Sequence, residues 1–195
     1  ILDKPKAGWT AHQLARVTRY GVLLFTLGIP SLCALAFALG VAWTILRPGS
    51  FASNVLQWQV KEQGALFLPA GDGKDTITDP RDIAAVAVKV LTTPGHEGKI
   101  YELTGPELLS YAEVVRKMAT AVGKPLKYVD VPEAKAREGM LSAGIPPLLA
   151  DSILCYFAGV KAGRMFTTST VAELLGRPAH SFDEWLRDNA AALMK

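Results

Sequence analysis

The feature that most constrains the fold of this chain is an uncharged stretch that runs from residue 21 to residue 46. By length alone, such a stretch can cross a membrane as a helix. Two glycines and a proline divide it, however, into shorter pieces at 22–27, 31–39 and 41–46, whose lengths suit a strand, a short helix and a second strand. Strands of parallel sheets are buried on both faces and read as continuous apolar runs. We therefore favour a buried α/β core, with a membrane-inserted segment as the open alternative.

The composition indicates one globular domain that does not bind nucleic acid. The chain has 195 residues, and 50% of them are apolar, which is enough for a sizeable core without disulfide bonds. Its 21 basic and 18 acidic residues are scattered and leave a net charge of +3, so no basic run follows a phosphate backbone. Cys33 and Cys155 stand in apolar sequence and are predicted to be small buried residues, which indicates a reducing, cytoplasmic setting.

Beyond residue 50 the chain alternates between strand and helix patterns. Strands are predicted at 66–68, 99–103 and 126–131, and residues 69–74 are predicted to form a loop. Helices are predicted at 51–63, from Pro80 to about residue 91 behind an Asp79 cap, at 110–122 up to Gly123, and in several pieces after residue 133, the last behind a Ser181 cap. The strand, helix, strand order over 99–131 predicts a parallel βαβ unit, and the whole pattern predicts an α/β fold.

Several short motifs occur in an order that is typical of one family. The strand-and-turn motif WTILRPGSF at 43–51 comes first and is followed by Asn54. Then come GDGK at 71–74, ITDPRDIA at 77–84, YELTGP at 101–106, LSY at 109–111, and a tail at 171–185 that contains LGRP and SF. Together these motifs resemble NmrA-like proteins, which are atypical short-chain dehydrogenases. The tail is similar to their quinone-oxidoreductase-like and azoreductase-like branch, and the resemblance covers about residues 41–195.

This resemblance implies a Rossmann-like parallel sheet, incomplete on its N-terminal side, with a small helical substrate-side lobe from about Pro132 onward. Residues 41–195 would form the C-terminal part of an NmrA-like NAD(P)-binding domain, and residues 1–40 a divergent or truncated remnant of the dinucleotide-binding half. The Gly-rich pyrophosphate turn of the family has no counterpart in residues 1–40. The implied cofactor is NADP or NAD, and the residues expected near its nicotinamide end are Arg47, Pro48, Gly49, Ser50 and Phe51.

The sequence assigns no catalytic residue. In short-chain dehydrogenases with the usual acid-base pair, a lysine follows the tyrosine by four positions, and none of the five tyrosines of this chain has one there. The substrate-side candidates are one amide and three aromatic residues: Asn54, Tyr156, Phe157 and Phe166. Asp82 is expected to order neighbouring loops and His96 to be an exposed turn residue. The histidines lack ligand-spaced partners, so no metal site is predicted.

The leading hypothesis is an NAD(P)H-dependent oxidoreductase that reduces a quinone-like planar acceptor in its intact form, because such cofactors transfer hydride with little acid-base help from the protein. Two alternatives stay open. One is a non-enzymatic NAD(P)-binding redox sensor with a protein partner, and the other is a protein anchored in a membrane through residues 21–46. An incomplete sheet would also leave an exposed apolar edge, which predicts self-association into a homo-oligomer.

Overall fold

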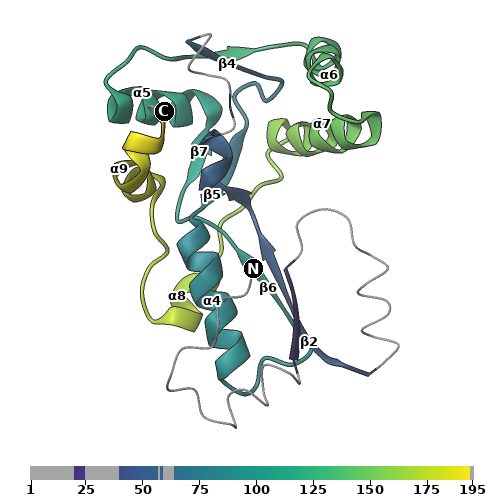
Figure 1. Cartoon of the computed structure of the whole chain (residues 1–195), viewed down its shortest axis with the longest axis vertical. Coiled ribbons are helices and arrows are strands. Elements are labelled where there is room, and N and C mark those ends of the chain that lie inside the picture. The colour runs from purple at the N-terminus through teal and green to yellow at the C-terminus, as the bar shows by residue number, and fades with distance from the viewer. Residues whose placement is uncertain (1–19, 25–39, 57, 59–63, 194–195) are drawn as a thin grey trace.

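The computed structural model describes residues 20–24, 40–56, 58 and 64–193 of the chain (Figure 1). The helix predicted at 31–39 and the predicted burial of Cys33 fall outside these residues, as does most of the segment 1–40. The second cysteine, Cys155, is exposed, so the prediction that it is a small buried residue is wrong.

Both described ends of the uncharged stretch are strands of one parallel sheet. Strand β1 (Tyr20–Leu24) pairs with β2 (Ala42–Pro48), and β2 pairs with β6 (Lys99–Leu103), so the strand order is β1-β2-β6. Leu46 of β2 and Leu103 of β6 are fully buried, as the buried-core interpretation requires. Within the described part of the chain, no helix has the length and apolar character needed to cross a membrane.

The remaining strands form two further groups. β3 (Ser50–Phe51) pairs in parallel with β5 (Lys74–Thr78), β5 pairs antiparallel with β7 (Leu108–Ser110), and β4 (Ala65–Leu68) pairs in parallel with β8 (Lys127–Asp130). The βαβ unit predicted over 99–131 is wrong, because β6 pairs with β2 whereas β8 pairs with β4. The helix predicted at 51–63 is wrong at its start, where β3 is followed by the short 3₁₀ helix η1 (Ala52–Leu56).

Helix α4 (Pro80–Thr92) covers the β1-β2-β6 sheet, and its start is as predicted. The Asp79 carboxylate accepts the Arg81 N–H at 2.8 Å, and Pro80 takes the first helical position, where a missing N–H has no cost. The apolar side of α4 packs on β2, β6 and helix α8 (Thr170–Leu175), in a core made of Leu46, Ile83, Val86, Val90, Leu103 and Val171. One core therefore fixes the sheet, α4 and α8 together.

A second core lies between α5 (Tyr111–Val122), α9 (Phe182–Leu193), η1 and the β5 region. Ser110 and Glu113 form a capping box at the start of α5, and Gly123 ends it with a φ of 66°, both where the sequence predicts the ends. Ser181 caps α9, since its hydroxyl accepts the Glu184 N–H at 3.2 Å. The core holds buried residues from all these elements, among them Val55, Ile77, Val114, Met118 and Trp185.

The helices after Pro132 do not all belong to one lobe. Helices α6 (Glu133–Ser142) and α7 (Pro147–Lys161) pack against each other, whereas α8 packs on α4 and α9 packs on α5. Figure 1 shows α6 and α7 on the side of the molecule away from α9. The pair α6 and α7 therefore has partners other than those of α8 and α9, and α7 also contributes Phe157 and Val160 to the second core.

Candidate functional site

The segment 47–51 lies where the parallel sheet ends. Because β1, β2 and β6 run in the same direction, their carboxyl ends meet at one edge, where Pro48 is level with Leu103. Open α/β sheets bind their ligands outside this edge. The Gly49 N–H donates to the Leu103 carbonyl at 2.8 Å and extends the pairing one residue further. The five residues expected near the cofactor thus lie at the carboxyl edge of the sheet.

Gly49 approaches β5 too closely for any side chain. A Cβ atom at this position would lie 2.6 Å from the Thr76 hydroxyl oxygen and 3.3 Å from the Thr76 carbonyl oxygen. Real Cβ atoms essentially never come within 3.0 Å of another heavy atom, so a side chain at this position would force the Thr76 hydroxyl to move and would crowd the Thr76 carbonyl oxygen. The turn after β2 is therefore held against β5.

The side chains of the segment face different surroundings. The Arg47 guanidinium lies 3.2 Å from the Glu102 carboxylate, its neighbour across the β2–β6 pair, and both side chains are exposed. An exposed ion pair adds little stability and leaves the guanidinium accessible. Phe51 packs instead against the core under α4, and Ser50 is half-buried. Arg47 and Ser50 are thus the polar side chains that the segment offers to a ligand.

Beside Ser50 lies a buried carboxyl group that two phenols hold. Asp75 of β5 is only 1% exposed. The Tyr156 hydroxyl lies 2.7 Å from both of its oxygens, and the Tyr111 hydroxyl donates to one of them at 2.8 Å. Ser50 lies close enough to both phenols to lower their pKa. We call Ser50, Asp75, Tyr111 and Tyr156 the Asp75 cluster; it joins β3, β5, α5 and α7.

The surroundings of the Asp75 cluster favour its neutral forms. Burial raises the pKa of the Asp75 carboxyl above its ordinary value, against the opposing effect of the hydrogen bonds from Tyr156 and Tyr111. Burial, and then the nearby Asp75 carboxylate, raise the pKa of both phenols. Tyr111 and Tyr156 therefore remain protonated donors at neutral pH, and Asp75 is the member whose charge can change.

The predicted substrate-side residues separate into different environments. Tyr156 belongs to the Asp75 cluster, next to the predicted cofactor residue Ser50. Phe157 is in the core and meets the Tyr111 ring edge-on, with ring centroids 5.6 Å apart. Phe166 is exposed after α7, and Asn54 is half-buried on η1. The structure thus unites Ser50 and Tyr156 and gives Phe157 a packing role.

Sequence reasoning missed Asp75 and assigned no role to Tyr111. Asp75 lies in a strand with a single apolar residue, Ile77, so no alternating pattern marks it. Tyr111 follows the Ser110 cap and reads as the first residue of an ordinary helix. The one available signal was an acidic residue directly after the 71–74 loop, which contains two glycines.

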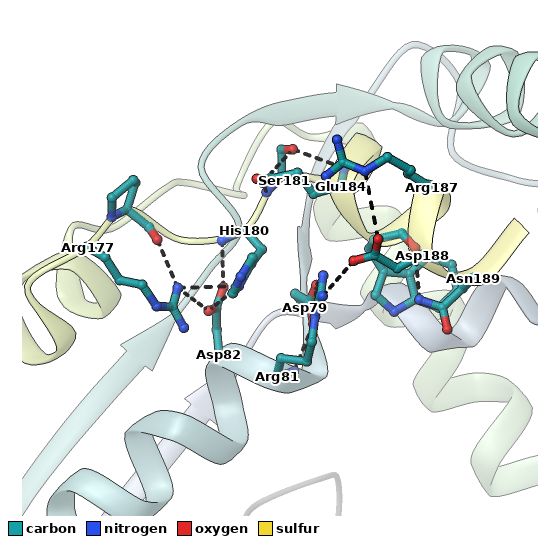
Figure 2. A network of polar contacts seen from close by, with 12 residues as sticks. Asp79, Arg81, Asp82, Arg177, His180, Ser181, Glu184, Arg187, Asp188 and Asn189 are labelled. Carbon is teal, nitrogen blue, oxygen red and sulfur yellow. Dashed lines mark hydrogen bonds and ion pairs between the residues drawn. The ribbon is translucent and has the colours of Figure 1, made fainter.

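A separate polar network ties the start of α4 to the tail of the chain (Figure 2). Asp82 is fully buried and accepts the backbone N–H of His180 at 2.7 Å, and its other oxygen lies 2.7 Å from the His180 ring and 2.8 Å from Arg177. Nearby, Arg81 bridges Asp79 and Asp188. The predicted ordering role of Asp82 is confirmed, and it acts on the link between α8 and α9.

His96 lies in the turn between α4 and β6, as predicted, but it is half-buried rather than exposed. Its ring nitrogens lie 2.7 Å from the Tyr101 hydroxyl and 2.9 Å from the Thr93 hydroxyl. Burial lowers the pKa of the ring, so neutral His96 is favoured. Among the described residues no group of three or more His, Cys, Asp or Glu side chains could hold a metal ion.

Parallel strands flanked by helices, with a glycine turn at their carboxyl edge, define a Rossmann-type α/β protein. The chain belongs to the NmrA-like family of atypical short-chain dehydrogenases. It is 40% identical over 163 residues to an NAD(P)H azoreductase of Xenophilus azovorans, which covers 78% of this chain and 54% of the azoreductase. A scan against models of protein families finds no match.

Quinone oxidoreductase 2 of Escherichia coli is 32% identical over 148 residues, which covers 74% of this chain and 52% of that protein. The crystal structure of the Escherichia coli NADPH-dependent quinone oxidoreductase QOR2, complexed with NADPH, aligns with this chain at a TM-score of 0.69 and 30% identity. The alignment covers 80% of this chain and 56% of that protein. The chain thus spans about half the length of the curated relatives it matches.

Proposed function

We propose that the chain is part of an NAD(P)H-dependent oxidoreductase that reduces a quinone-like planar acceptor in its intact form. The observation that carries this proposal is the 40% identity to an NAD(P)H azoreductase over 163 residues. A second relative, a quinone oxidoreductase, supports the same class of acceptor. Azo compounds and quinones share a flat conjugated system that accepts a hydride, so we expect a planar acceptor.

The position and charge of segment 47–51 support its assignment to the nicotinamide end of a dinucleotide. It lies at the carboxyl edge of the parallel sheet, and Arg47 gives that edge an accessible positive charge, which suits an anionic cofactor. Gly49 lies against β5 and Phe51 packs on the core under α4, so the course of the segment is fixed. When bound, NAD(P)H supplies the hydride, and these residues hold and orient it.

We place the acceptor between this segment and the α6–α7 lobe. Tyr156 is partly exposed and borders Ser50 through the Asp75 cluster, and Asn54 follows the segment on η1. Phe166 adds an exposed aromatic ring after α7. Because NAD(P)H is an intracellular reductant and Cys155 is a free exposed thiol, we expect the protein to work in the cytoplasm.

The proposal is tested by titrating the purified chain with NADPH and NADH, with nucleotide fluorescence and thermal shift followed together. We expect saturable binding that Arg47→Ala weakens roughly fivefold, equivalent to about 1 kcal/mol. Arg137→Ala is the matched control, because Arg137 is also exposed and paired, with Asp151 at 2.7 Å. If the two variants bind the nucleotide equally well, Arg47 does not contact the cofactor. If the unmodified chain does not bind either nucleotide, the proposal of a cofactor site in this chain is rejected.

A redox sensor that binds NAD(P) without turnover is the second candidate. The observation that favours it is that no tyrosine of the chain has a lysine four positions later. Oxidation of NADPH in the presence of a naphthoquinone separates the two functions. Turnover supports the reductase, whereas tight binding without turnover of any planar acceptor supports the sensor.

A further inference from the structure

The Asp75 cluster is an unusual way to bury a carboxyl group. Its hydrogen-bond donors are two phenols and the Thr76 N–H, and among the described residues no lysine, arginine or histidine forms an ion pair with Asp75. A buried carboxyl without a cationic partner is costly to ionise, so it exchanges a proton more readily than a salt-bridged one. Such groups concentrate at functional sites.

Tyr156 connects this carboxyl group to the surface. Asp75 and Tyr111 are 1% and 2% exposed, whereas Tyr156 is 37% exposed. Ser50, which contacts the Tyr156 hydroxyl, belongs to the segment 47–51 assigned above to the cofactor. An acceptor placed against that segment therefore meets Tyr156 as the outermost proton-bearing group of the cluster.

We propose that the Tyr156 hydroxyl is the proton donor to the reduced acceptor and that Asp75 positions it and restores its proton. The inference rests on the proposed reductase function and adds a catalytic residue to it. Hydride addition to a quinone leaves a negative charge on a carbonyl oxygen, and one proton completes the hydroquinone. A positioned donor supplies that proton faster than water does.

The proton moves in two linked steps. Protonated Asp75 donates to the Tyr156 oxygen, which leaves the phenol hydrogen free to face the acceptor. When the acceptor oxygen takes the phenol proton, the O–H bond of Asp75 breaks and its proton replaces the one that Tyr156 lost. The product leaves with one hydride from NAD(P)H and the phenol proton of Tyr156. The Asp75 carboxylate then takes a new proton from water.

Ionised Asp75 switches this donor off. The Tyr111 and Tyr156 hydroxyls then both donate to the Asp75 carboxylate, so neither hydroxyl hydrogen faces the acceptor. The titratable groups that face Asp75 are Tyr111 from α5 and Tyr156 from α7; β3 contributes Ser50, and β7 places Leu109 opposite Asp75. Lys161, at the end of α7, lies against Gly71 instead. Acceptor reduction is therefore expected to fall as the pH rises through the Asp75 titration.

The test compares the unmodified chain with Tyr156→Phe, Asp75→Asn and, as a control, Tyr101→Phe, whose phenol bonds to His96 away from the cluster. Reduction of a 1,4-naphthoquinone by NADPH is followed from pH 5 to pH 9 in H₂O and D₂O. Tyr156→Phe should lower kcat about 100-fold and abolish the solvent isotope effect, with NADPH affinity unchanged. Asp75→Asn should retain the isotope effect and lose the pH dependence.

A second measurement needs no cofactor. A hydroxynaphthoquinone probe is titrated against the protein by tryptophan fluorescence, and its oxygen accepts from Tyr156 only when Asp75 is protonated. Tyr156→Phe should weaken probe binding at least about fivefold at pH 5 and much less at pH 8. Equal probe binding by Tyr156→Phe and Tyr101→Phe, or a kcat of Tyr156→Phe within twofold of the unmodified chain, overturns the proposal. Tyr156-dependent probe binding without NADPH binding would reject the reductase function alone.

Discussion

Asp82 and His180 are 98 positions apart in the sequence, yet the Asp82 carboxylate accepts the His180 backbone N–H at 2.7 Å and contacts the His180 ring at the same distance. This contact joins the first turn of α4 to the link that precedes α9. Since α4 packs on the β1-β2-β6 sheet and α9 packs on α5, this contact, which Figure 2 shows, connects the elements that carry the two cores.

Asp82→Ala should therefore destabilise the protein by about 2–3 kcal/mol, because it leaves a partly buried N–H and two polar side chains without their acceptor. Urea unfolding at neutral pH measures this change. The control is Asp188→Ala, which removes a half-exposed partner of Arg81 and should cost no more than about 0.5 kcal/mol. Similar losses of unfolding free energy in both variants would show that the Asp82 contact stabilises the protein no more than an exposed ion pair does.

Gly49→Ala tests the close approach of the turn after β2 to β5. Its new Cβ would meet the Thr76 hydroxyl oxygen at 2.6 Å, so the Thr76 side chain or one strand must move, and we expect a loss of about 1–3 kcal/mol. Gly139→Ala on α6 has open space around the new methyl group and should stabilise the helix by about 0.5–1 kcal/mol. A neutral Gly49→Ala in thermal unfolding would mean that the turn is not held against β5.

Ser110→Ala tests the capping box of α5. The variant removes the acceptor of the Glu113 N–H, and we expect a loss of about 1 kcal/mol in urea unfolding. Ser152→Ala on α7 is the control, because its hydroxyl only bonds back to the Leu148 carbonyl within the helix and alanine is the better helix former. The expectation fails if the two serine variants have equal stability.

The parts of the fold that the sequence predicts correctly are those with local signals. Asp79 with Pro80, Ser110 with Glu113, and Gly123 each mark a helix end through interactions within a few residues. The apolar runs at 22–27 and 41–46 are equally visible, and they coincide with part of β1 and with most of β2. The family also follows from the order of motifs along the chain, which needs no knowledge of strand pairing.

Strand pairing and the buried polar site depend on contacts that are distant in sequence. β5 contains one apolar residue among five, yet four of its residues are buried. Its polar groups find partners from elsewhere: Asp75 binds Tyr111 and Tyr156, and the Thr78 hydroxyl donates to the Leu103 carbonyl. The same dependence explains the wrong βαβ prediction, because nothing local decides whether β8 pairs with β6 or with β4.

The charge state of Asp75 gives a prediction about stability that is independent of any cofactor. Its pKa is higher in the folded protein than in the unfolded chain, so folding favours the protonated form. The stability that this group contributes is fully present below its ordinary pKa of 3.8 and is lost as the pH rises through the folded pKa. Asp75→Asn, which stays neutral, should not show that loss.

The measurement is the free energy of unfolding in urea for the unmodified chain and for Asp75→Asn between pH 4 and pH 8. As the pH rises, the stability of Asp75→Asn should increase relative to that of the unmodified chain. Tyr156→Phe keeps Asp75 but removes a donor to its carboxylate, so this variant should lose more stability over the same pH range than the unmodified chain does. Carboxyl groups with lowered pKa, such as Glu113 and Glu184, change stability in the opposite sense but are common to every variant, so they cancel in the comparison. A difference that is constant with pH would show that Asp75 ionises as it does in water, and it would remove the physical basis for a proton held between Asp75 and Tyr156.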